Sequence, residues 1–165
     1  MDPTTITNTN PMAHMDLSTS LIWMFFGSIF IGIFLDGMNI LAFRLNDIYY
    51  SNELILMALF MASNMCITEV AMYSYYSNNI EYISFFLFII FSLIIAYALR
   101  EQITINDEQW LRRMIGHHSV AVTTSHKILE KAKNKKVKTL AGSIIANQEK
   151  EIALMKQILS DDFKV

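Results

Sequence analysis

The sequence predicts an all-α membrane protein, with three transmembrane helices followed by an antiparallel two-helix hairpin that completes a bundle by oligomerisation. Three long apolar runs predict the spans, and two apolar stripes at helical spacing predict the hairpin. Charge separates the two parts, because residues 1–99 carry a net charge of −6 whereas residues 100–165 carry +4. We therefore divide the chain into a flexible tail (1–19), a transmembrane domain (20–99), a linker (100–106) and a hairpin (107–160).

The transmembrane domain is predicted from apolar runs that hold at most one charged residue each. A hydrocarbon layer of about 30 Å requires about 20 helical residues, and each run is long enough. Tyrosines stand near the ends of the runs, as in the aromatic belts of membrane interfaces. The predicted spans are Leu21–Phe43, Leu54–Tyr76 and Tyr82–Leu99.

The hairpin is predicted from two amphipathic helices joined by a short polar turn. Asn106 or Asp107 suits the N-cap of the first helix, and the run Lys133–Lys136 interrupts the apolar pattern. A hairpin of this size buries little core alone. We therefore expect it to pair with a second copy in a four-helix bundle or to pack onto the membrane domain.

The stretch MIGHHSVAVTTSH (114–126) places two adjacent histidines on the first hairpin helix. Met114 lies one turn before them, and residues equally distant from the turn of an antiparallel hairpin face each other. The spacing therefore brings a carboxylate and a second thioether to the same level, with Gln148 beside them. Imidazole and thioether donors together favour copper, and thioethers select Cu(I). The predicted metal ligands are His117, His118, Met114, Glu151 and Met155.

The same residues also allow a structural interpretation. A histidine pair that faces a glutamate can form a buried hydrogen-bonded layer that fixes the register of the hairpin, since buried polar groups need partners. His126 lies two turns closer to the hairpin turn, where we expect a surface histidine.

The two segments MIGHHSVAVTTS and LAGSIIANQEKEIALM resemble the DUF family 305 module. The resemblance implies a ferritin-like helical module, linked in several members to copper handling, and a subgroup with three membrane helices before the module. The linker REQIT (100–104) also resembles that subgroup. Gly116 stands where many relatives have proline, and Thr124 stands where copper-linked members have methionine. The matching positions are Met114, His117, His118, Ala121, Val122, Leu140, Ala141, Ile145, Gln148, Glu151, Ile152 and Met155.

The polar side chains inside the predicted spans include Asp36, Asn64 and Glu69, and burial of such groups in hydrocarbon is costly and usually indicates a function or a partner. At 1.5 Å per residue, Asp36 and Asn64 lie at similar depths and can pair. Glu69 lies deeper and is expected to meet a neighbouring subunit, a water cavity or a cation. Interhelical hydrogen bonding and an ion path both remain open for these residues.

Sulfur-containing side chains form a second pattern. Met57, Met61, Met65 and Met72 follow helical spacing in the second span, with Cys66 beside them. Such a stripe favours adaptable packing over a Cu(I) relay. The N-terminal tail carries Met12, His14 and Met15, which are either incidental or a flexible group that captures copper.

These observations favour a non-enzymatic, membrane-anchored protein that binds a metal, with copper as Cu(I) or Cu(II). The alternatives are a structural or assembly protein whose hairpins drive oligomerisation, and a small ion transporter or channel. The sequence contains no nucleophile–base pair, phosphate loop or open zinc motif, and we identify no small-molecule substrate. The expected partners are the lipid bilayer and further copies of the chain, while the mild basic surplus does not indicate nucleic acid.

The distribution of basic residues predicts the topology. Arg44, Arg100, Arg112 and Arg113 lie on one side of the three spans, whereas the tail and the second loop have no basic residue. The positive-inside rule therefore places the hairpin in the cytosol. The family resemblance implies the opposite, periplasmic side.

Overall fold

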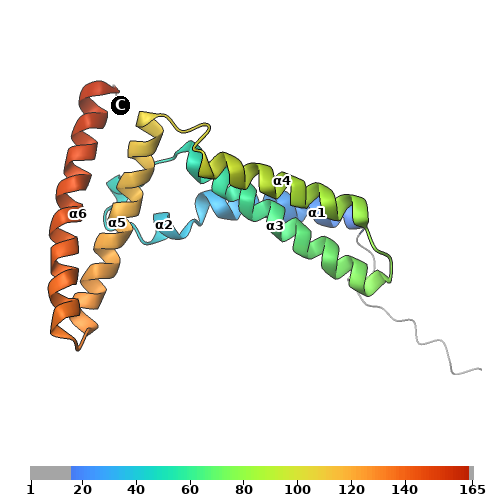
Figure 1. Cartoon of the computed structure of the whole chain (residues 1–165), viewed down its shortest axis with the longest axis horizontal. Helices are drawn as coiled ribbons and strands as arrows, with labels where there is room; N and C mark the ends of the chain where they lie inside the picture. The colour runs from blue at the N-terminus through green and yellow to red at the C-terminus, as the bar shows by residue number, and fades with distance from the viewer. Residues whose placement is uncertain (1–15, 164–165) are drawn as a thin grey trace, which may run out of the picture.

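The computed structural model describes residues 16–163, and all regular elements of this range are helical (Figure 1). Two parts are visible: a bundle of three long helices and a pair of helices at one end of it. The elements in chain order are α1 (Leu17–Phe34), α2 (Gly37–Ile40), η2 (Leu45–Asp47), α3 (Asn52–Ser77), α4 (Tyr82–Arg100), α5 (Asp107–Lys131) and α6 (Lys135–Asp162).

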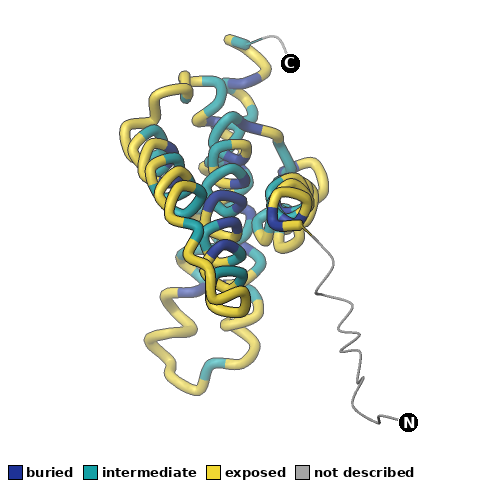
Figure 2. The backbone as a smooth tube through the Cα atoms, turned by 90° about the vertical axis from the view of Figure 1, so that its right-hand side faces the viewer, coloured by how far each residue is buried: buried dark blue, intermediate teal, exposed yellow. Residues whose placement is uncertain are grey.

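Three helices are long and apolar enough to cross a membrane: the segment Leu17–Ile40, α3 and α4. Helix α3 packs against both of its neighbours and holds most of the buried residues of this part. Much of the apolar surface of α1 and α4 faces outward, as the exposed parts of the tube show (Figure 2). Outward apolar side chains are expected where lipid replaces water as the surrounding solvent.

The first span ends earlier than the sequence predicts. We expected one helix over Leu21–Phe43, whereas α1 covers Leu17–Phe34 and the chain breaks at Asp36 before the short helix α2. Asp36 has an extended backbone conformation, with φ −57° and ψ 134°. At this break its carboxylate lies 3.6 Å from the guanidinium of Arg113 in α5.

Helices α1 and α3 approach each other closely at a glycine. A Cβ atom at Gly32 would lie 2.9 Å from Ala58 Cβ and 3.0 Å from Ala58 Cα. Small residues of this kind allow membrane helices to pack at short distance. Ala58, Ala62 and Cys66 continue the buried face of α3 along the contact.

Helices α5 and α6 lie side by side and run in opposite directions, joined by residues 132–134 (Figure 1). Side-chain caps start both helices, because Asn106 accepts a hydrogen bond from Gln109 N and Asn134 accepts one from Lys136 N. This satisfies amide groups that have no partner within the helix. The pair runs across the direction of the three long helices and does not continue them.

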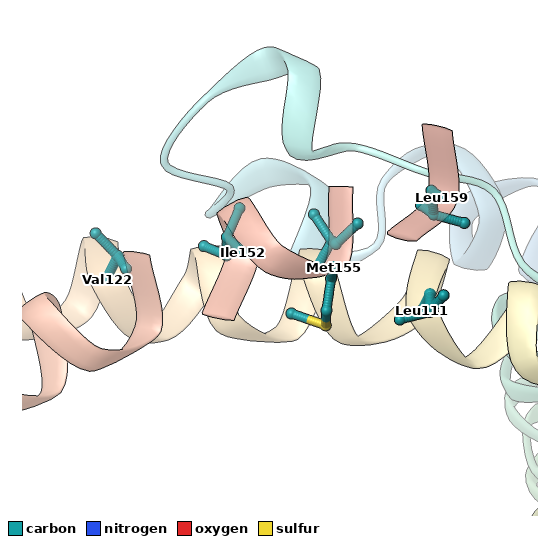
Figure 3. Close-up of a cluster of buried hydrophobic side chains, with 6 residues drawn as sticks. Leu111, Val122, Ile152, Met155 and Leu159 are labelled. Carbon is teal, nitrogen blue, oxygen red and sulfur yellow. The ribbon is translucent and has the colours of Figure 1, made fainter. Parts of the chain in front are cut away.

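A buried apolar cluster joins the two helices (Figure 3). Leu111 and Val122 come from α5, and Ile152, Met155 and Leu159 come from α6, with Ile115 completing the cluster. The segment between α2 and α3 packs against this pair, and Tyr49 contacts the cluster. The hairpin core is therefore covered in part by the loop that connects the first two spans.

Candidate functional site

His118 and Glu151 meet across the hairpin. His118 Nδ1 lies 3.0 Å from Glu151 Oε2, and the imidazole is 16% exposed while the carboxylate is 53% exposed. The distance is within the range of an ion pair, but no hydrogen bond joins Nδ1 to the carboxylate. The contact therefore leaves a buried nitrogen without a hydrogen-bond partner.

His117 is an exposed neighbour of this contact. Its ring centroid lies 6.1 Å from that of His118, and the two ring planes are inclined at 62°. Consecutive residues of a helix point about 100° apart, so only His118 faces α6 directly. His126 lies closer to the turn and stacks on Phe43 with a centroid distance of 5.1 Å.

The predicted sulfur ligands lie in or beside the apolar core. Met155 is 6% exposed and belongs to the cluster, and Met114 packs against it. By helical register, Met114 is one turn from His118 and Met155 is one turn from Glu151. Gln148, one turn to the other side of Glu151, has a buried Oε1 atom without a hydrogen-bond partner. Thr124 is exposed and donates to backbone oxygens of its own helix.

Nitrogen and oxygen ligands alone do not complete a metal site here. Within residues 16–163 no three histidine, cysteine, aspartate or glutamate side chains are grouped closely enough to hold a metal ion. The predicted tail ligands Met12, His14 and Met15 lie outside the described residues. Any metal bound at His118 and Glu151 would thus need a thioether as a further ligand.

Burial lowers the pKa of His118 below its usual value of 6.5, an effect opposed by the charge of Glu151 and increased by His117. The folded state therefore favours neutral imidazole, which is the form that binds metals.

We expect the metal-free protein to lose stability as the pH falls below about 6.5, because the unfolded chain takes up a proton at His118 more readily than the folded chain does. The loss is complete once the pH lies below the lowered pKa of the folded state. Thermal unfolding in detergent between about pH 8 and about pH 5 measures the effect. The His118→Gln variant should show a flatter profile, and equal profiles for the two proteins would contradict the assignment.

A second polar cluster, which the sequence did not reveal, attaches the hairpin to the membrane part. Asp47 of η2 is fully buried, with Lys156 Nζ 2.5 Å from Oδ1 and Ser119 Oγ donating to Oδ2 at 2.7 Å. Ser119 Oγ also accepts a hydrogen bond from Phe43 N at 2.7 Å. We call Asp47, Ser119 and Lys156 the docking cluster. In the sequence, the only indication of the docking cluster is Asp47, an acidic residue in the short loop between the first two predicted spans.

Gly116 faces the same loop. A Cβ atom at this position would lie 3.8 Å from Asp47 O, which is an ordinary contact distance. Gly116, the position at which this chain differs from the proline-containing sequences that it resembles, therefore faces the loop beside the docking cluster.

Arg113 makes a further bridge between the two parts. Its guanidinium lies 3.6 Å from Asp36 Oδ2 and 3.5 Å from Glu53 Oε1, and its side chain is only 12% exposed. The expected pairing of Asp36 with Asn64 is therefore wrong. Asp36 lies where α1 breaks, within reach of α5, so the nearest opposite charge attracts it.

The remaining intramembrane polar groups have partners inside the three-helix bundle. Asn64 accepts a hydrogen bond from Ser92 of α4, and Ser20 of α1 donates one to Glu69. Both contacts join neighbouring helices, as expected for an interhelical clamp. Glu69 thus faces α1 within one copy of the chain.

The sulfur stripe of α3 does not converge on one point. Met57, Met65 and Met72 are exposed on the outside of the bundle, and Met61 is half-buried. Cys66 is buried, and its Sγ lies 3.9 Å from the carbonyl oxygen of Leu21 in α1. Cysteine and exposed methionines therefore occupy different faces of the helix.

Comparison with known proteins locates the similarity. The model of the domain of unknown function DUF305 matches residues 97–159. The chain is also similar to Uncharacterized protein L153 of Acanthamoeba polyphaga mimivirus, with 32% identity over 146 residues that cover 88% of this chain and 95% of that protein. No solved structure matches the chain.

Proposed function

The chain belongs to the DUF305 family, and we propose that it is a membrane-anchored, non-enzymatic protein that binds copper between α5 and α6. The observation that carries the proposal is the contact between His118 and Glu151. It joins a neutral imidazole, whose pKa is lowered by burial, to a carboxylate 3.0 Å away, without a hydrogen bond between them. A buried nitrogen in this state is available to a ligand.

The donor set supports copper over zinc. His118 and Glu151 supply one nitrogen and one oxygen, while Met114 and Met155 stand one helical turn away on the same sides of α5 and α6. Thioethers bind Cu(I) and are poor ligands for zinc. The ring of His117 is exposed, with its centroid 6.1 Å from that of His118, so it would have to turn toward α6 to become a further ligand. Copper held by these groups would be retained beside the membrane without turnover of a substrate.

We expect stoichiometric copper binding by the protein purified in detergent and its loss in the His117→Ala/His118→Ala variant. Titration with Cu(I) and, separately, with Cu(II) measures the stoichiometry and the dissociation constant for each ion. His126→Ala is the matched control, because it removes an imidazole from the same helix at the Phe43 stack. Absence of stoichiometric binding, or binding that the double substitution leaves unchanged, would refute the proposal.

The same contact supports a structural role as the second candidate. His118 and Glu151 lie on opposite helices of the hairpin, so the packing of their side chains at one level favours one register. If the double variant unfolds more readily than the parent protein in a copper chelator, the contact stabilises the hairpin without metal. Copper binding and this role are separated by measuring the unfolding temperature with and without the metal.

A further inference from the structure

The end of the hairpin carries an unpaired group of lysines. Within residues 127–138 the only acidic residue is Glu130, and it pairs with Lys127 at 3.4 Å. The other lysines are exposed and have no ion pair within residues 16–163. We call this group the basic tip; its members are Lys131, Lys133, Lys135, Lys136 and Lys138.

The orientation of the hairpin places the basic tip beside the membrane. The hairpin runs across the direction of the three long helices, at the end where α1 breaks and α3 begins (Figure 1). The bilayer surface is perpendicular to helices that span it, so the hairpin extends along this surface. The docking cluster, the bridge through Arg113 and the ion pair between Arg44 and Glu149 hold it in that position.

Exposed apolar side chains accompany the lysines. Ile128 and Val137 are 44% and 42% exposed, and Leu140 is 60% exposed. These residues line a shallow hollow at the tip together with Thr124, Ser125, Ala141 and Ile144. A helical surface that combines lysines with exposed aliphatic residues is typical of segments that lie in the headgroup region of a bilayer.

We infer that the basic tip binds anionic lipid headgroups of the same membrane that the three long helices cross. Five unpaired positive charges match a negatively charged lipid surface, and the docked hairpin already extends along it. Juxtamembrane lysines are attracted to such surfaces over about one Debye length, which is roughly 10 Å at 0.1 M salt. The contact fixes the free end of the hairpin, whereas the docking cluster fixes its middle.

The test uses the full chain in vesicles with a fluorophore attached to a Val137→Cys variant. The vesicles contain either only zwitterionic lipid or roughly 30% phosphatidylserine, and both carry a quencher on the lipid headgroup. We expect stronger quenching in the anionic vesicles and loss of the difference at about 1 M salt, where the Debye length is about 3 Å. The chain without Val137→Cys measures background labelling of Cys66.

Lysine substitutions inside the basic tip, compared with a control pair outside it, assign the effect to the tip. Replacing all five lysines of the tip by glutamine should reduce the quenching in anionic vesicles to the level of zwitterionic vesicles. As a charge control, Lys133→Gln/Lys136→Gln is compared with Lys127→Gln/Lys150→Gln, which removes the same charge outside the tip. Only the first pair should reduce the quenching, and circular dichroism verifies that both proteins remain helical.

Three results would overturn the inference. The first is equal quenching of the unsubstituted tip in both kinds of vesicle, which requires no variant to fold. The second is quenching that the five-lysine variant retains. The third is a tip label that is quenched by labels on other copies of the chain and not by the lipid headgroups, which would assign the tip to contact with a second copy.

Discussion

Replacing Lys156 by methionine is expected to lower the free energy of unfolding by about 3 kcal/mol. Asp47 is fully buried and Lys156 is its only cationic partner within residues 16–163, so the variant leaves a buried carboxylate with Ser119 alone. Removing one member of a buried ion pair typically costs about 3–5 kcal/mol. The lower end of this range applies because the Lys156 side chain is 26% exposed, so water can enter in place of the ammonium group and solvate part of the Asp47 carboxylate. Unfolding in detergent, followed by the fluorescence of Trp110, measures the change.

Two comparisons isolate the docking cluster. Lys150→Met changes an exposed lysine on the same helix and should alter stability by no more than about 0.5 kcal/mol. The Asp47→Asn/Lys156→Met variant buries no charge and should regain most of the loss. Limited proteolysis between η2 and α3 provides a local readout, because release of Asp47 exposes that loop. Equal losses for Lys150→Met and Lys156→Met would show that the pair does not hold the loop.

Substitution of Gly32 by leucine is expected to separate α1 from α3 and to destabilise the three-helix bundle by about 1–3 kcal/mol. A Cβ atom at Gly32 lies 3.0 Å from Ala58 Cα, and backbone cannot move aside as a flexible side chain can. Cys66 reports the separation, because it is buried against Leu21 of α1. Alkylation of Cys66 by a membrane-permeant thiol reagent should be faster in the variant than in the parent protein.

Gly27→Leu provides the matched control for this prediction. Gly27 lies on the same helix, and a Cβ atom there would meet no atom within 4 Å. The same change in size and helix propensity therefore occurs without a collision. If the two variants alkylate at the same rate, close packing at Gly32 does not determine the position of α1.

Local patterns were sufficient for the helices but not for the ends of the first span. Apolar runs identified the three long helices, since apolar residues dominate each run. At the break, Asp36 lies 3.6 Å from Arg113 of the second part, and the apolar run alone does not indicate this contact. The start at Leu17 was missed because Ser18 and Ser20 make the first turn appear polar, although Ser20 bonds inward to Glu69.

The candidate site was predictable to the level of one helical turn. Counting from the hairpin turn places both histidines near the level of Ile152, with Glu151 beside it, and in the structure His118 contacts Glu151. The count could not decide between His117 and His118, because consecutive residues differ only in rotation about the helix axis. The docking cluster lay beyond such reasoning, since Asp47 is separated by 72 residues from Ser119 and by 109 from Lys156. No periodicity relates residues so distant in the chain.

The loop between α2 and α3 gives one residue, Asp47, contact with both hairpin helices. Residues 101–106 connect the two parts covalently. The loop between α2 and α3 holds them in place through side-chain contacts with both hairpin helices. A substitution of Asp47 would remove the acceptor of Ser119 and the charge partner of Lys156 in one step. A single position of this loop therefore affects the placement of α5 and α6 together.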